Sequence, residues 1–257
     1  MPARNLGSQD FMLPFAGASA TAHKFTRQGL GTIEPRQPKM LGRLALLDVG
    51  PGLVTKLAVS GHQLLLGDGF PAAALRPGSI TDRHNVLGCA AGPNSPLELV
   101  VEYTNAAKLS GYVGTDPVDP ALLEDVLDAM EAGRLFGPGN WGWGLGEKSI
   151  AAAGGTGKWS VRVPREANLG RLVVCVYDGG QPVNVVGDCM LQQFDIAGND
   201  MLARSGDLDA LLLDPSNSDE DGLNVGEFVT SSDLVELEFV NNHAANAYTV
   251  QVGFWTD

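Results

Sequence analysis

The residues best suited to bind a metal ion are three oxygen donors, Asn217, Asp219 and Asp221, which precede Gly222. Oxygen ligands at alternate positions followed by a glycine match the first half of a calcium-binding loop. The position at which such a loop needs a bidentate glutamate is occupied by Phe228. The segment therefore has two interpretations, a weak calcium site or an acidic loop that is only hydrated.

A second kind of metal site would require clustered histidines. Cupin enzymes bind a metal through a His-x-His pair, a carboxylate and a later histidine. The histidines of this chain are never two residues apart; they are His23, His62, His84 and His243. Only His62 and His84, which have Asp68 and Asp82 nearby in the sequence, offer a candidate. We expect surface histidines or hydrogen-bonded core histidines instead.

Motifs for nucleophilic catalysis and phosphate binding are absent from the sequence. The G-x-S-x-G motif of serine hydrolases does not occur. Residues 154–158, Gly-Gly-Thr-Gly-Lys, lack the spacing of a phosphate-binding loop and a preceding strand, so we interpret them as a flexible linker. We assign no catalytic or cofactor-binding residue and expect a protein that is not an enzyme.

Two tryptophans, Trp141 and Trp143, alternate with glycines within residues 137–146. Indole rings in such a segment can stack on carbohydrates or bases. They can also anchor a linker against a neighbouring domain or subunit. We favour the anchor.

Short apolar runs separated by turns dominate the chain and predict an all-β fold. Leu44–Val49, Val54–Val59 and Leu97–Tyr103 are examples, and a turn containing glycine or asparagine follows each of them. Charged residues make up only 18% of the chain, and its 33 glycines and 15 prolines favour many short strands.

One helix is predicted over residues 119–132, with Asp119 as its N-cap and Pro120 in its first turn. Its apolar positions fall on one face, which we expect to be buried; they are Leu122, Leu123, Val126, Leu127 and Met130.

The two halves of the chain resemble each other. The tetrapeptide Leu-Gly-Arg-Leu occurs twice, and two further matches follow in the same order. The matched segments are 41–44 with 169–172, 99–107 with 235–245, and 111–116 with 252–257, at shifts of 128, 136 and 141 residues. This order predicts a duplicated unit. Each half has about eight short apolar segments, which suits a two-sheet antiparallel sandwich such as a jelly roll.

Charge is distributed unevenly along the chain. Residues 1–43 contain six basic and two acidic residues, and the remainder carries a net charge of −17. The total of −13 excludes a nucleic-acid binder whose whole surface is the binding site. The basic N-terminal arm, residues 1–22 and the segment that follows, suggests contact with phosphates or lipid headgroups. A solvated tail without a partner fits it equally well.

Cysteines and apolar segments indicate where the protein is made. Cys89, Cys175 and Cys189 are too few and too scattered for a disulfide framework, so we expect buried free thiols. We find no apolar segment of the kind that forms a signal peptide or a membrane span, and we expect synthesis in the cytoplasm.

The organisation of the chain resembles that of the double jelly-roll major capsid proteins of the tectivirus–adenovirus lineage, with the small icosahedral bacteriophages as the nearest type. The resemblance covers residues 23–257 and rests on tandem β units, a basic arm and an interposed helix. Segments 101–105 and 237–241 resemble the late strands of such rolls. The halves are short for the family, and long surface loops are absent.

The resemblance implies a viral structural protein of the virion that assembles as pseudo-hexameric homotrimers and then with neighbouring capsomers into an icosahedral shell. It also implies contacts with minor capsid proteins and, through the basic arm, with an internal membrane or the genome. The implied organisation is an arm (1–22), a first jelly roll (23–116), a helix with a Gly/Trp-rich linker (117–157) and a second jelly roll (158–257). The alternatives are a bimodular carbohydrate- or receptor-binding protein and a bicupin-type enzyme.

Overall fold

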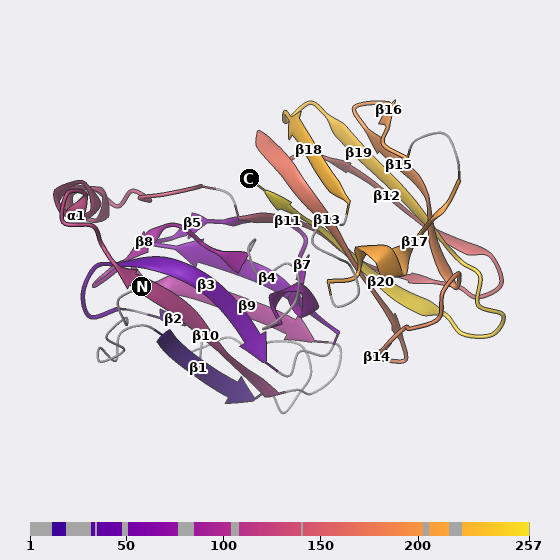
Figure 1. Cartoon of the computed structure of the whole chain (residues 1–257), viewed down its shortest axis with the longest axis horizontal. Coiled ribbons are helices and arrows are strands. Elements are labelled where there is room, and N and C mark those ends of the chain that lie inside the picture. The colour runs from indigo at the N-terminus through magenta and orange to yellow at the C-terminus, as the bar shows by residue number, and fades with distance from the viewer. Residues whose placement is uncertain are drawn as a thin grey trace, which may run out of the picture.

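In the part of the chain that the structure describes, the strands fall into two groups with one α-helix between them (Figure 1). The computed structural model describes residues 12–18, 32–33, 35–47, 51–76, 85–103, 108–139, 141–202, 206–215 and 223–256. Apart from the α-helix and short 3-10 helices, the regular elements of these residues are strands, which confirms the prediction of an all-β fold. We refer to residues 12–117 as the N-terminal half and to residues 142–256 as the C-terminal half.

The N-terminal half has two antiparallel sheets. One has the order β1-β10-β3-β8; the other has the order β2-β9-β4-β5, and β7 also pairs with β4. The elements are β1 (Met12–Ala18), β2 (Thr32–Ile33), β3 (Lys39–Leu47), β4 (Gly52–Val59), β5 (His62–Gln63), β6 (Leu65–Gly67), β7 (Phe70–Pro71), the 3-10 helix η1 (Ala72–Leu75), β8 (Ala90–Ala91), β9 (Leu97–Tyr103) and β10 (Lys108–Pro117).

The C-terminal half also has two sheets. One has the order β14-β13-β20-β11-β6, with β18 also on β13; the other has the order β12-β19-β15-β16, with β17 also on β15. The elements are β11 (Gly142–Ile150), β12 (Gly155–Arg162), β13 (Ala167–Asp178), β14 (Gln181–Pro182), β15 (Cys189–Ile196), β16 (Asn199–Asp200), β17 (Leu208–Asp209), the 3-10 helix η3 (Ala210–Leu213), β18 (Asn224–Val229), β19 (Leu234–Asn241) and β20 (Tyr248–Thr256).

The pairing pattern of the N-terminal half recurs in the C-terminal half. The order β1-β10-β3-β8 corresponds to β11-β20-β13-β18, and β2-β9-β4-β7 corresponds to β12-β19-β15-β17. The short hairpin strand β5 on β4 corresponds to β16 on β15. A 3-10 helix follows β7 and β17 alike, and η3 begins 138 residues after η1.

The repeated tetrapeptide Leu-Gly-Arg-Leu forms the same irregularity in both halves. Gly42 and Arg43 of β3 together oppose one residue of β10, because Leu41 pairs with Thr115 and Leu44 pairs with Val113. The pairing of β13 with β20 shifts register at the equivalent place. Two residues opposite one is the arrangement of a β-bulge.

The prediction of a linker over residues 117–157 is wrong for residues 142–150 and 155–157. Gly142–Ile150 and Gly155–Arg162 are strands that pair with β20 and β19, so they begin the C-terminal half. The sequence pattern fails here because glycine usually marks a turn, whereas Gly144 lies within a strand at a place where Gly69 passes too close for a side chain.

The predicted N-terminal arm overlaps a strand. Met12–Ala18, within the predicted arm 1–22, pairs with β10 along its full length. β1 therefore holds the same place in the N-terminal half that β11 holds in the C-terminal half.

The predicted helix exists and is shorter than expected. Helix α1 spans Leu123–Glu131, and Asp119 accepts a hydrogen bond from the Ala121 N–H (2.9 Å) one turn before it. Val126 and Ala129 are the helix residues that become buried. The leucines of the predicted apolar face remain 40–46% exposed, because the helix touches the N-terminal half along a narrower stripe; they are Leu122, Leu123 and Leu127.

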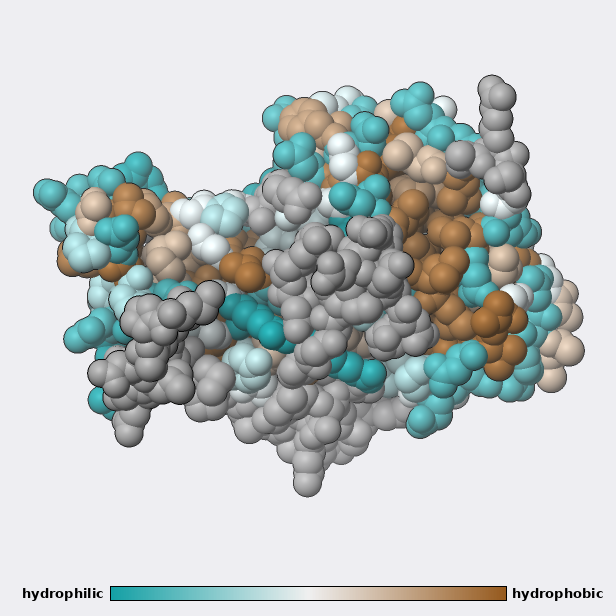
Figure 2. Space-filling view, in the orientation of Figure 1, coloured by the Kyte–Doolittle hydropathy of each residue, from teal (hydrophilic) through white to brown (hydrophobic). Residues whose placement is uncertain are grey.

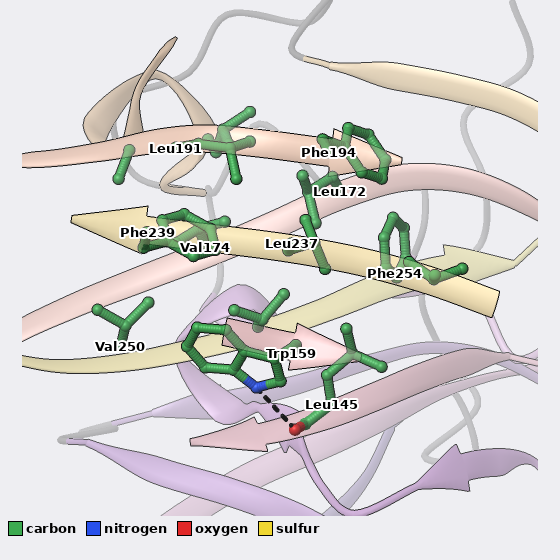
Figure 3. Close-up of a cluster of buried hydrophobic side chains, with 14 of the residues drawn as sticks. Leu145, Trp159, Leu172, Val174, Leu191, Phe194, Leu237, Phe239, Val250 and Phe254 are labelled. Carbon is green, nitrogen blue, oxygen red and sulfur yellow. Dashed lines mark hydrogen bonds between the residues drawn. The ribbon is translucent and has the colours of Figure 1, made fainter. Parts of the chain in front are cut away.

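The core of the C-terminal half lies between its two sheets. Figure 3 shows Leu172, Val174 and Phe254 from one sheet facing Leu191, Phe194, Leu237 and Phe239 from the other. The Trp159 indole packs edge-on against Phe239, with ring centroids 5.5 Å apart, and its N–H donates to the Leu145 carbonyl oxygen (3.1 Å). Satisfying this buried donor fixes the position of the ring.

Candidate functional site

The two halves are joined by direct backbone pairing. β6 of the N-terminal half pairs in parallel with β11 of the C-terminal half. The Trp141 N–H donates to the Leu64 carbonyl oxygen (2.9 Å), and the Asp68 N–H donates to the Gly144 carbonyl oxygen (2.9 Å). One sheet of the C-terminal half therefore takes its edge strand from the N-terminal half.

Glycines allow this close approach. A Cβ atom at Gly144 would lie 2.0 Å from the carbonyl carbon of Gly69, and one at Gly67 would lie 2.1 Å from the Gly144 carbonyl oxygen. Gly67 also has a φ of 79°, which favours glycine. These contacts are with backbone atoms, which cannot turn aside as a flexible side chain can, so the junction requires glycine at both positions.

An aromatic cluster fills the junction. The Phe70 ring lies 5.2 Å from the Trp141 ring and 4.6 Å from the Trp255 ring, and Trp141 and Trp255 are edge-to-face at 4.6 Å. Phe70 belongs to β7, and its two partners belong to or immediately precede strands of the C-terminal half. All three side chains are buried, so the halves share one apolar core at this point.

Strand β13 contributes to both cores. Val174 and Val176 belong to the apolar cluster of the C-terminal half, whereas Val173, Cys175 and Tyr177 belong to the cluster built on the N-terminal half. Alternate residues of a strand point to opposite faces, so both faces of this sheet are covered. The contact between the halves is thus a packed apolar interface.

The tryptophans singled out from the sequence are part of this junction. Trp141 and Trp143 are 3% and 1% exposed, and Trp143 stacks on Phe254 at 5.7 Å. Buried rings of this kind anchor packed segments, and neither presents a face to a carbohydrate. The stacking surface that would have favoured a carbohydrate-binding module is not formed by these residues.

The histidines within the described residues make local structural contacts. His62 Nε2 lies 2.7 Å from the Gly133 carbonyl oxygen, and His243 Nδ1 accepts from the Asn246 N–H (2.9 Å). His23 and His84 lie outside the described residues. No group of three or more metal-ligating His, Cys, Asp or Glu residues occurs in the part of the chain that is described.

The predicted calcium ligands, Asn217, Asp219 and Asp221, lie outside the described residues. Both interpretations of that segment, a calcium site and a hydrated acidic loop, therefore stay open.

Asn241, which belongs to one of the matched segments of the sequence repeat, stabilises the turn between β19 and β20. Its buried side-chain amide donates to the carbonyl oxygens of Ile150 (3.1 Å) and Asn246 (2.9 Å). Its side-chain oxygen accepts from the His243 N–H (3.0 Å). The turn between β19 and β20 is thereby fixed to the end of β11. Its sequence partner, Asn105, lies outside the described residues.

All three cysteines are buried free thiols, as predicted. Burial raises the pKa of the Cys89 thiol to about 12, and it does the same for Cys189, beside Asp209 and Asp188. Burial also raises the pKa of Cys175 well above its usual value. Nucleophilic cysteines need a lowered pKa, so these thiols have the character of core residues.

No protein-family model matches the chain, and no curated protein matches it significantly. Among the described residues, no helix is long and apolar enough to cross a membrane.

The junction glycines and the apolar loops of the C-terminal half are not among the sites predicted from the sequence. Gly67 lies in Gly67-Asp68-Gly69, which has the appearance of an ordinary turn. The pair Val185-Val186 and the run Leu211–Leu213 were available as signals, because consecutive apolar residues outside a long strand often mark a contact surface.

Proposed function

We propose that this chain is a viral structural protein, a major capsid subunit whose two halves are jelly rolls and whose homotrimers form pseudo-hexameric capsomers of an icosahedral shell. The observation that carries the proposal is the strand order of each half. No chemical site within the described residues competes with it.

The strand order supports the jelly-roll assignment. If the eight repeated strands of each half are numbered along the chain, the two sheets have the orders 1-8-3-6 and 2-7-4-5 in both halves. Eight antiparallel strands arranged as two Greek keys in two sheets are the definition of a jelly roll, a fold used by many viral capsid proteins. Because one fold can serve several functions, the duplication and the charge distribution are added as further support.

Duplication within a single chain provides the second support. Closed rings of identical chains have as many equivalent positions as chains, so three chains with two similar units each present six similar units. The tight contact between the halves, through Phe70, Trp141 and Trp255, keeps the two units in a fixed relation, as a rigid building block requires.

The basic N-terminal segment supports an inner face near anionic material. Six of the chain's 17 basic residues occur before residue 44. Positive charge next to lipid headgroups or a packaged genome is favourable, whereas the acidic remainder of the chain would be repelled.

Electron microscopy of the purified protein tests this proposal. We expect ring-like capsomers with three-fold symmetry and six density lobes, and closed shells at high protein concentration. A protein that forms neither under any concentration or salt condition would overturn the assignment.

A further inference from the structure

The segment β7–η1 of the N-terminal half is buried by the C-terminal half. Phe70 is fully buried between Trp141 and Trp255. It also lies over Gly253, where a Cβ atom would be 2.6 Å from the Phe70 ring. Residues Ala72–Leu75 belong to the same apolar cluster as three residues of β13. This segment is therefore one side of a contact between two similarly folded units.

Among the described residues, no segment covers the equivalent part of the C-terminal half, β17–η3, in the same way, although Ala210 and Leu213 are buried. β17 pairs with β15 as β7 pairs with β4. Leu212, which is 138 residues after the fully buried Ala74, is 56% exposed. Val185 and Val186, in the loop after β14, are 57% and 81% exposed.

Val186 and Leu212 border a hollow on the surface. A pocket of about 520 Å³ is lined by Asn184, Val186, Asp209, Leu211 and Leu212. Figure 2 shows a hydrophobic area on the C-terminal half in the region where Figure 1 places β17 and its neighbouring loops. We call Val185, Val186, Leu211 and Leu212 the β17–η3 surface. Val185, Val186 and Leu212 are its exposed members, and Leu211, which is 9% exposed, lies beneath them. Exposed apolar residues that lie together are typical of protein contact sites.

We propose that the β17–η3 surface binds a second copy of this chain, through the outer face of that copy's β1–β10–β3–β8 sheet. The proposal rests on the proposed function and names the contact that joins the subunits. The partner follows from the repeat. Segment β7–η1 packs on the sheet that contains β11, β20 and β13, and the equivalents of these strands are β1, β10 and β3.

The contact is head to tail. Each chain exposes, on its C-terminal half, the counterpart of β7–η1, and it carries, in its N-terminal half, the counterpart of the sheet that β7–η1 covers. A heterologous contact of this kind closes into a ring when its rotation allows closure. Contacts within and between chains would then alternate around the ring.

The repeat also predicts which side chains meet. Phe70 and Gly253 are in contact within the chain; their equivalents, by shifts of 138 and 141 residues, are Leu208 and Tyr112. In the predicted pair, leucine takes the place of phenylalanine and tyrosine takes the place of glycine. The side-chain volume lost at the first position is therefore restored at the second. We expect Leu208 of one copy to pack on Tyr112 of the next.

The first test combines the substitutions Val186→Asp and Leu212→Asp. Both positions are exposed, so we expect the melting temperature to stay near that of the wild type. Light scattering should show the variant as a monomer at concentrations where the wild type is fully assembled. Leu127→Asp, at a similarly exposed leucine on α1, is the matched control and should assemble normally.

The outcomes separate the two proposals. If the wild type assembles and the double variant assembles equally well, the β17–η3 contact is overturned and the proposed function stands. If the wild type is a monomer at every concentration tested, both the β17–η3 contact and the proposed function are overturned.

A second test measures the predicted pairing directly. Chains with Leu208→Cys and chains with Tyr112→Cys are mixed and treated with a short bismaleimide; the native thiols are buried and should not react. Cross-linked dimers should form in the mixture and be rare in either variant alone. Assembled mixtures that give no more dimer than the single variants would overturn the pairing.

Discussion

Leu41 lies opposite Thr115 in the pairing of β3 with β10, and the same register places Leu169 opposite Thr256 in the pairing of β13 with β20. In both halves the register then shifts by one residue at the Gly-Arg pair that follows the leucine. A β-bulge is a specific local feature. Its recurrence at the same place, beside the same residue types, is strong evidence that the halves are copies of one unit.

The junction between the halves should not tolerate a side chain at Gly144. A Cβ atom there would lie 2.0 Å from a backbone carbon of Gly69, so Gly144→Ala forces these two segments apart. We expect a loss of about 1–3 kcal/mol of stability, or a fall of roughly 3–10 °C in melting temperature. Gly139→Ala is the control, because no atom lies within 4 Å of that position. Equal melting temperatures for the two variants would contradict the account.

The halves should unfold together because they share a core. Scanning calorimetry of the wild type should show one transition. Phe70→Ala removes the ring that contacts Trp141 and Trp255 and should cost about 3–5 kcal/mol while separating the transition into two. Phe194→Ala changes a residue of the C-terminal core alone, so it should destabilise the protein and leave a single unfolding transition. Two transitions in the wild type would show that the junction does not couple the halves.

Stability should fall at alkaline pH because of the buried thiols. The folded pKa of Cys89 and Cys189 is raised from 9.0 to about 12, so the unfolded chain loses these protons first as the pH rises. Stability contributed by the neutral thiols is complete below pH 9.0 and is lost as the pH rises toward 12. Each thiol should contribute about 1.4 kcal/mol of loss per pH unit in this window.

Denaturant titrations from pH 8 to 11 measure this slope. The double variant Cys89→Ala, Cys189→Ala should lose stability less steeply than the wild type over the same range. Identical slopes would mean that these thiols do not titrate differently in the folded and unfolded states.

Removing the N-terminal residues should have two separable effects. Deletion of residues 1–22 removes β1 and its pairing with β10, so it should lower the melting temperature of the fold. Replacing Arg4, Lys24 and Arg27 by Gln keeps β1 and removes charge only. We expect that variant to keep its melting temperature and to bind anionic vesicles or nucleic acid more weakly, as measured by co-sedimentation at low salt. Unchanged binding would contradict the hypothesis that the basic arm contacts lipid or nucleic acid at the inner face of the shell.

The sequence predicts the strands and the duplication well because both are local. Alternating apolar residues and turns mark most strands, and Leu-Gly-Arg-Leu marks the repeat. The alignment is less exact near residue 101. The matching irregularities of β4 with β9 and of β15 with β19 relate Val101 to Phe239, a shift of 138 rather than 136. An error of two residues keeps every side chain on its face, so the alternation could not reveal it.

The junction could not be predicted because it depends on distant segments. Gly144 has the appearance of a linker residue until Gly69 is placed against it. The exposure of Leu122 and Leu127 on α1 likewise depends on how narrow a stripe of the helix the N-terminal half covers, which helical periodicity does not encode.

The mass of the purified wild-type protein, measured by multi-angle light scattering over a range of concentrations and salt, tests the central claim most directly. The account predicts a species of three chains of 27.0 kDa each, with larger assemblies at higher concentration. A single species of 27.0 kDa under every condition would contradict it.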